Sequence, residues 1–159
     1  MDHVIGIRTT VVSGKTTASL QGCGNVADGA NTLITFDEGK RCWINKVIYR
    51  EPAGSQAGTN ADPAKRPVFV AGDSDTDIAM LKDATDLKLV INRNKVQLMC
   101  NAYANHQGKW LVQPMFIAPK SCASTPYACN TKLDAAGQPI VNEAGAVFTQ
   151  TYADTVCTF

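Results

Sequence analysis

The chain has almost no net charge and no long apolar run. Its 159 residues include 15 Lys and Arg against 14 Asp and Glu, a formal net charge of +1. We therefore expect neither nucleic acid nor an anionic membrane as a partner. No apolar stretch approaches the length of a membrane span, and there is no internal repeat, heptad or long run of like charge. With 45% hydrophobic residues, the composition predicts one domain with a real core.

Histidine is scarce, and the sequence contains no Cys-x-x-Cys. The two histidines, His3 and His106, lie far apart in sequence. A zinc site is therefore the less favoured use of the six cysteines, and disulfide formation is the other. Spacing alone does not choose among the possible pairings.

Three of the cysteines lie in a turn-rich tail near the C-terminus. Cys122 and Cys129 would close a small loop if oxidised, and Cys23 and Cys42 could form a second pair. Cys100 lies on the apolar face of a predicted helix, where we expect a buried thiol. Disulfides are typical of exported proteins, yet the N-terminus has neither the basic nor the apolar region of a signal peptide.

The order of the apolar segments predicts a mixed α/β fold. Thr9–Val12 and Thr16–Leu20 flank a Ser-Gly turn and predict a β-hairpin near the N-terminus. The clearest loop, rich in Gly, Ala, Ser, Asn and Pro, covers residues 54–67. Further strands are predicted at residues 33–36, 68–71, 87–91 and 110–117, and helices at about residues 40–48, from residue 78 and at 96–103.

The most informative stretch is an acidic run that follows an apolar strand. Val68–Ala71 has the pattern of a strand buried on both faces, and Gly72 permits a sharp exit at its carboxyl end. Asp73, Asp75 and Asp77 follow at alternate positions, before a helical pattern. Open α/β sheets bind ligands at this edge, and Mg²⁺ uses one or two protein carboxylates with phosphate and water. The sequence therefore predicts a magnesium site.

The acidic run has two other interpretations besides a magnesium site. A calcium-binding loop beginning at Asp73 would need Gly at its sixth position and Glu at its twelfth, where this chain has Ile78 and Ala84. Those two mismatches make calcium the weaker choice. A solvated turn with a helix cap at Asp75 or Thr76 is the simpler alternative and stays open.

Residues 72–77, Gly-Asp-Ser-Asp-Thr-Asp, with Met80-Leu81 after them, resemble the fourth motif of the haloacid dehalogenase (HAD) superfamily. Its phosphatases carry Gly-Asp-x-x-x-Asp at a strand end. The resemblance implies that Asp73 ligates Mg²⁺ and that Asp77 supports the metal site. The segment order through residue 117 is similar to that of secreted bacterial members that include phosphorylcholine phosphatase.

A lysine also begins the amphipathic helix upstream of the acidic strand. Gly39-Lys40 precedes apolar residues at positions 43, 44, 47 and 48, which form one helix face. Lys40 is similar to the lysine of the superfamily's third motif, which neutralises charge on the nucleophile and the phosphoryl group. Lys46 is the second choice for this role. The alternative for both lysines is a solvated position on the helix.

The first motif of the superfamily is not found in the sequence. Phosphatases of this kind begin with a strand ending in Asp-x-Asp-x-Thr or Val, whose first Asp attacks phosphorus and whose second serves as acid and base. The nearest pattern, at residues 73–77, has Asp77 where Thr or Val is required. The second motif, a Ser or Thr that holds phosphate, cannot be placed either. The resemblance therefore implies the carboxyl-terminal part of a phosphatase, inactive or nearly so alone.

We expect an α/β fold with a partial Rossmann-like (HAD-like) sheet, flanking helices, an N-terminal β-hairpin and an irregular tail that contains cysteines. Residues 1–117 would form the partial HAD-like domain, with residues 118–159 packed on it as the tail. In the superfamily, the first two strands of the sheet lie beside the acidic strand, and this chain lacks them. Their absence would leave one edge of Val68–Ala71 unpaired. We expect either that Val4–Val12 pairs with that edge, or that another chain covers it by swapping or dimerisation.

Two functional classes follow. The first is a remnant of a Mg²⁺-dependent HAD-type phosphomonoesterase that keeps Lys40, Asp73 and Asp77 and binds Mg²⁺ weakly. The second is a non-catalytic binding or assembly module, such as a mobile-element or metagenomic gene product that kept the stable part of the fold. The family resemblance also implies a periplasmic or secreted location, and it makes phosphorylcholine a substrate to consider.

Overall fold

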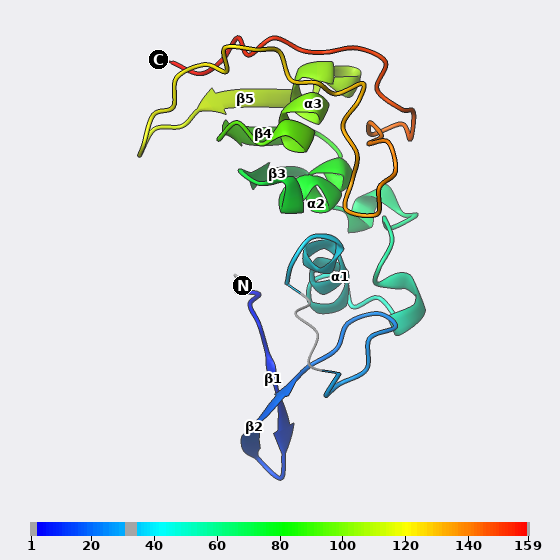
Figure 1. The fold of residues 1–159 in the computed structure, drawn as a ribbon. Coiled ribbons are helices and arrows are strands. Elements are labelled where there is room, and N and C mark those ends of the chain that lie inside the picture. Colours follow the sequence, from blue (N-terminus) through cyan, green and yellow to red (C-terminus); the bar gives the residue numbers. More distant parts are fainter. Residues whose placement is uncertain (1–2, 31–34, 159) are drawn as a thin grey trace. The chain divides into compact units, whose positions relative to one another are not determined.

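A computed structural model describes residues 3–30 and 35–158 of the chain (Figure 1). The chain forms two compact units, residues 1–67 and 68–159. Within the described residues, no helix is both long enough and apolar enough to cross a membrane. The strand expected at residues 33–36 begins outside the described residues, and its last two positions form a bend.

The first unit contains the expected hairpin. Strand β1 (Thr9–Val12) pairs antiparallel with β2 (Lys15–Leu20). Ser13 and Gly14 between them both have positive φ, 50° and 75°, as a tight two-residue hairpin turn requires. Because β2 is the partner of β1, the expectation that Val4–Val12 pairs with the acidic strand is wrong.

Helix α1 (Glu38–Val47) of the first unit is fastened by a disulfide between Cys23 and Cys42, which confirms that pairing. Trp43 is buried beside this bond, and the Lys46 ammonium lies 4.6 Å from the centre of its ring. The unit is too small to bury a large apolar core. The disulfide and the buried indole stabilise it instead.

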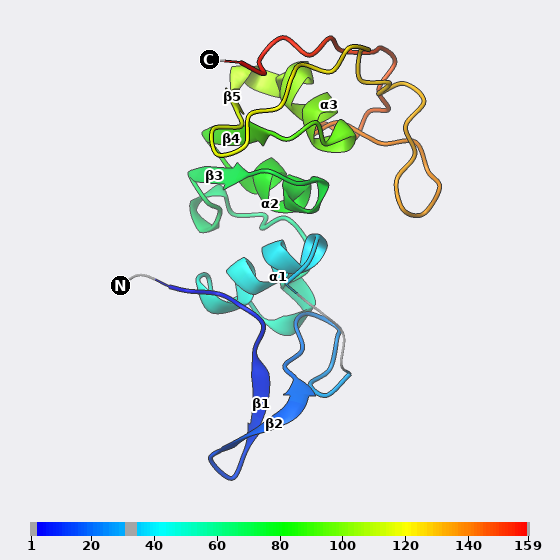
Figure 2. The same cartoon turned by 60° about the vertical axis from the view of Figure 1, so that its left-hand side comes forward.

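The second unit is built on a three-stranded parallel sheet. Its strands are β3 (Phe69–Gly72), β4 (Leu87–Asn92) and β5 (Trp110–Pro114), in the order β3-β4-β5. Helix α2 (Ile78–Asp83) connects β3 to β4, and α3 (Val96–Ala104) connects β4 to β5. Figures 1 and 2 show both helices on the same face of the sheet. Two successive crossovers in one direction place their helices on one face, because each crossover is right-handed.

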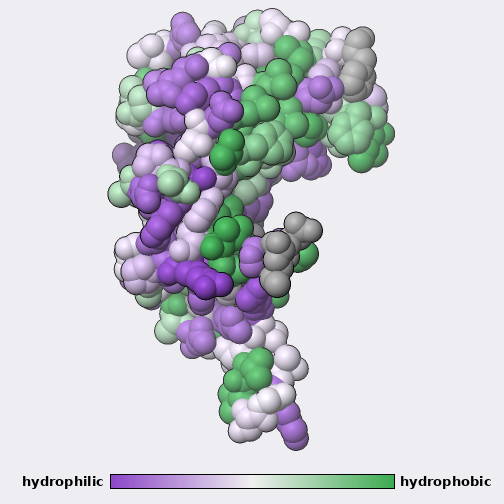
Figure 3. Space-filling view, turned by 180° about the vertical axis from the view of Figure 1, so that it is seen from behind, coloured by the Kyte–Doolittle hydropathy of each residue, from purple (hydrophilic) through white to green (hydrophobic). Residues whose placement is uncertain are grey.

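Within the second unit, the described residues 68–158 leave the other face of this sheet uncovered. Strand alternation places seven side chains on it, none of them charged: Phe69, Ala71, Leu87, Leu89, Ile91, Leu111 and Gln113. Phe69 is 52% exposed and Leu111 51%. Figure 3, which views the molecule from behind, shows a hydrophobic band on the side where these strands lie. We call these seven residues the bare face.

The bare face corrects one expectation about the acidic strand. The pattern of residues 68–71 predicted burial on both faces, but only Val70 is buried, and Val68 is 65% exposed. The prediction is wrong because an all-apolar strand is the signature of a sheet covered on both sides, and residues 68–158 place helices on one side only.

Two disulfides attach the tail, and both differ from the expected pairing. Cys100 on α3 is bonded to Cys129, and Cys122 is bonded to Cys157. The predictions of a small Cys122–Cys129 loop and of a free buried thiol at Cys100 are therefore wrong. The tail returns across α3, so residues distant in sequence meet, and sequence spacing carries no information about such contacts.

The tail packs on the helical side of the sheet through two similar turns. Residues 133–140 and 141–148 each follow the order apolar, Asp or Asn, any, Ala, Gly, any, any, apolar, so the expectation of a chain without repeats is wrong at this short length. In each turn the Asp134 or Asn142 side chain accepts two backbone N–H groups. The last residues of the two turns, Ile140 and Phe148, are buried in the core.

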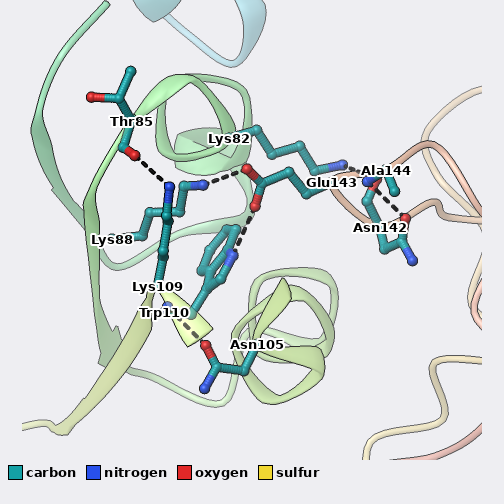
Figure 4. Close-up of polar contacts among 9 residues, drawn as sticks. All are labelled: Lys82, Thr85, Lys88, Asn105, Lys109, Trp110, Asn142, Glu143 and Ala144. Carbon is teal, nitrogen blue, oxygen red and sulfur yellow. Dashed lines mark hydrogen bonds and ion pairs between the residues drawn. The ribbon is translucent and has the colours of Figure 1, made fainter. Parts of the chain in front are cut away.

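A buried lysine joins the second turn to the sheet (Figure 4). Lys88 on β4 is 1% exposed, and its ammonium donates to the carboxylate of Glu143 in the tail. The Trp110 indole N–H donates to the other oxygen of Glu143 at 3.0 Å. Lys82 also donates to two tail carbonyls. These polar contacts hold the tail in place and satisfy groups that would be costly to bury alone.

Candidate functional site

The acidic run lies at the carboxyl end of β3, where the sequence predicted a ligand site. Asp73 follows the last residue of the strand, Gly72. Asp75 and Asp77 are the ends of a short 3₁₀ turn that leads into α2. The three carboxylates therefore share one loop, but each has a different partner.

Asp77 holds the loop together from inside. It is 4% exposed, and its Oδ2 accepts the backbone N–H groups of Asp73 at 2.9 Å and Ser74 at 3.0 Å. Ser74 in turn caps the 3₁₀ turn, which completes a capping box. A Cβ on Gly72 would lie 2.6 Å from the Asp77 Cβ, so only glycine fits before this loop.

Asp75 caps a different helix. Its Oδ1 accepts the N–H of Leu98 at 2.8 Å, in the first turn of α3. The residue at the N-cap position of α3, Lys95, makes no such hydrogen bond with its side chain. Asp75 thus satisfies a helix N–H that would otherwise lack a partner, and its negative charge lies at the positive end of the helix dipole. The alternative of a cap at Asp75 or Thr76 for the helix that follows is wrong, because Ser74 caps that turn and Asp75 instead caps α3.

Asp73 is the member of the run with an open carboxylate. Its side chain is 44% exposed, and Oδ2 accepts the Arg93 guanidinium at 2.7 Å. Arg93 directly follows β4 and was not chosen as a site residue from the sequence. A signal was available, because the carboxyl ends of neighbouring parallel strands meet at one edge of a sheet. Asp73 and Arg93 together present an exposed carboxylate and an exposed guanidinium at this edge.

The two lysines chosen from the sequence lie in the first unit. Lys40 is in the first turn of α1, as predicted. Lys46 donates to the Gly22 carbonyl at 2.6 Å and packs on Trp43, so its ammonium has a local structural role. Lys40 belongs to the first unit and Asp73 to the second.

No group of three or more His, Cys, Asp or Glu side chains converges as a metal cage among the described residues. Mg²⁺ does not require such a cage, because it is commonly held by one or two carboxylates with waters and substrate phosphate. Asp73 has the exposure that such a ligand needs, whereas Asp77 is engaged with the backbone of its own loop.

Beside Arg93, a buried polar network closes the end of β4. Asn92 is 2% exposed, and its amide donates to Asp154 Oδ1 and to the Val156 carbonyl, both at 2.8 Å. Tyr103 also donates to Asp154, at 2.7 Å. Burial, and then the hydrogen bond to Asp154, raises the pKa of Tyr103. Nothing in the sequence pattern pointed to this network, because its members come from β4, α3 and the tail.

Comparison with known proteins adds no relative. Searches of protein-family models, of curated proteins and of solved structures each found no match to this chain. What is established is a mixed α/β chain with a small antiparallel hairpin, a three-stranded parallel sheet and a disulfide-bonded C-terminal tail. The superfamily resemblance rests on the motif residues alone.

Proposed function

We propose that this chain is the carboxyl-terminal part of a Mg²⁺-dependent HAD-type phosphomonoesterase, with a partial HAD-like sheet, and that it lacks the aspartate nucleophile. The observation that carries the proposal is Asp73, an exposed carboxylate at the carboxyl end of a parallel strand, on a loop fixed by Asp77. A fixed loop at this edge is where α/β enzymes present metal ligands.

Each residue of the proposed site has a separate task. An oxygen of Asp73 would ligate the metal, and Asp77 would keep Asp73 in place through the loop backbone. Arg93 has the charge and planar geometry to hold two oxygens of a phosphate, and its present partner is the carboxylate that the metal would engage. In the intact enzyme, Lys40 would neutralise charge on the nucleophile and the phosphoryl group.

The chain alone should have little or no phosphatase activity. Without an aspartate to attack phosphorus, the phospho-enzyme step has no nucleophile, and metal and cations have no reacting group to assist. The substrate of the ancestral enzyme would be a phosphomonoester, with phosphorylcholine implied by resemblance only. The three disulfides favour an oxidising compartment such as the periplasm or the exterior.

The first test compares Mg²⁺ binding by the wild type and by the Asp73→Asn variant. Binding is measured from amide chemical shifts in a magnesium titration. We expect weak binding that shifts the amides of residues 72–77 and is lost in the variant, because the amide cannot replace a carboxylate ligand. Asp86→Asn is the matched control, since Asp86 is an exposed acid before β4. We also expect no hydrolysis of p-nitrophenyl phosphate by either protein.

Two results would count against the proposal. Hydrolysis that disappears in Asp73→Asn would show that the chain has its own nucleophile, so the claim of inactivity would fail. If magnesium shifts no amide in residues 72–77, or if Asp86→Asn weakens the effect as much as Asp73→Asn, the metal site itself would be refuted.

The bare face favours a second candidate, a non-catalytic assembly module. A parallel sheet with one open face is rare because its strands are apolar on both sides. In addition, β3 is an edge strand whose one strand partner in the described residues is β4. Both features would be covered if two copies of the chain associated through this side of the sheet.

Sedimentation of the Phe69→Lys variant tests this candidate. Phe69 lies on both the edge strand and the bare face, so a charge there opposes association by either route. We expect the wild type to associate with increasing concentration and Phe69→Lys to remain monomeric. The control is Leu133→Lys, at a similarly exposed leucine of the tail. A wild-type monomer at every concentration would exclude assembly through copies of itself.

A further inference from the structure

The C-terminal segment, residues 152–157, crosses the carboxyl end of β4 and covers Asn92. We call this segment the strap. Asp154 and Val156 of the strap accept both N–H groups of the Asn92 amide, which is why a polar side chain at a strand end is buried. Asn92 directly precedes Arg93, the partner of Asp73. The strap therefore covers the residue next to the candidate site.

Polar contacts to α3 and to the start of the tail hold the strap in the closed position. The Tyr103 hydroxyl donates to Asp154 and accepts the backbone N–H groups of Thr155 and Val156, each at 3.1 Å. The other carboxylate oxygen of Asp154 accepts the N–H of Ala123 at 2.8 Å. One carboxylate and one hydroxyl thus hold residues 154–156, while the backbone of Tyr152 pairs with that of Tyr127 at the start of the strap.

The two disulfides of the tail differ in exposure. The Cys100–Cys129 bond is buried at both ends, 0% and 1% exposed, and it fastens the first part of the tail to α3. The Cys122–Cys157 bond fastens the strap, and its Cys122 end is exposed whereas Cys157 is 4% exposed. A reductant can therefore approach the bond that holds the strap from its Cys122 end, whereas both ends of the bond that holds the rest of the tail are buried.

We propose that the strap is a reducible cover over the carboxyl end of β4, released when a dithiol reduces the Cys122–Cys157 disulfide. A thiolate of the dithiol attacks Cys122 Sγ, and Cys157 Sγ leaves and takes up a proton. The second thiol of the reductant then displaces Cys122 as a free thiol. The dithiol loses two electrons and becomes a disulfide, and both cysteines become thiols.

Release changes the environment of two tyrosines. Burial, followed by the negative charge of Asp154, raises the pKa of Tyr127, and the pKa of Tyr103 is raised by burial and by its bond to Asp154. The protonated hydroxyls therefore stabilise the closed strap below the ordinary pKa of 10.0, and this contribution is lost as pH rises through the raised values. With the strap open, tyrosinate should form nearer the ordinary value.

The test is graded reduction of the folded 159-residue chain with dithiothreitol, followed by alkylation and peptide mapping. We expect Cys122 and Cys157 to be labelled at least about tenfold faster than Cys100 and Cys129, because thiolate attack depends on access. Hydrogen exchange at the amides of Ala123, Thr155 and Val156 should accelerate at the same time, while the amides of β4 stay protected. Tyrosine absorbance should then titrate at lower pH.

Matched variants distinguish release of the strap from a general loss of stability. Cys122→Ser/Cys157→Ser should show the fast exchange without reductant, and Cys23→Ser/Cys42→Ser should leave those three amides unchanged. Asp154→Asn keeps the disulfide and should give partial release. Equal reduction rates for the two tail disulfides, unchanged exchange after Cys122–Cys157 is reduced, or loss of protection throughout β4 would each overturn the proposal.

Discussion

Glu143→Ala should destabilise the second unit by about 3–5 kcal/mol, the range observed when one partner of a buried ion pair is removed. The Lys88 ammonium is almost fully enclosed, so the variant would leave a buried charge without its carboxylate partner. The Trp110 indole N–H would lose its acceptor as well. Glu143 is itself partly exposed, with 17% of its side chain accessible, so the lower end of this range is expected.

Urea denaturation followed by Trp110 fluorescence, in a Trp43→Phe background, measures this effect on the second unit alone. Removing both charges together, as in Lys88→Met/Glu143→Leu, should recover most of the loss because no unpaired charge stays buried. Asp73→Ala is the control, since the pair of Asp73 with Arg93 lies in the same unit, is exposed on both sides and should contribute less than about 1 kcal/mol. An equal loss in the single and double variants would show that packing, and not charge, is responsible.

Asp77→Ala should destabilise the second unit by about 3 kcal/mol, because it removes two hydrogen bonds from backbone N–H groups to a buried carboxylate. The amides of Asp73 and Ser74 would then be left without this acceptor. By contrast, Asp73→Ala should cost less than about 1 kcal/mol, since its pair with Arg93 is exposed on both sides.

The same fluorescence assay, repeated with and without Mg²⁺, distinguishes structural from metal-binding acids. Asp77→Ala should lose stability in both conditions. Asp73→Ala should lose only the stabilisation that added Mg²⁺ gives the wild type, because ligand binding stabilises the folded state by mass action. Asp75→Ala serves as a reference, because the loss of a helix cap should lower the free energy of unfolding by about 1 kcal/mol. If Asp77→Ala were as mild as Asp73→Ala, the structural role of Asp77 would be disproved.

Local pattern was sufficient for most of the secondary structure. The expected strand at residues 87–91 is β4, and the helix at residues 96–103 is α3. In each segment, the spacing of the apolar residues places them on one side of the chain, facing the core, in only one backbone conformation. The strand expected at residues 110–117 ends earlier, at Pro114, where the register with β4 also ends.

For the candidate site, the sequence located the loop but did not assign its members. Three aspartates at alternate positions are chemically equal in the sequence. Their roles differ because Asp77 points into the loop, Asp75 reaches α3 and Asp73 faces Arg93. Each of these contacts depends on where a second segment lies in space, and a local sequence pattern does not predict that position.

The amino-acid sequence by itself determined the hairpin, the parallel β-α order and the acidic loop after β3, because turn residues and hydrophobic periodicity act within a few residues of the chain. Only the tertiary structure decided which cysteines pair, which face of the sheet stays bare and which carboxylate remains open. It also buried Lys88 against Glu143, 55 residues away. These outcomes follow from how the tail folds back over the helices, and that long-range packing leaves no local signal.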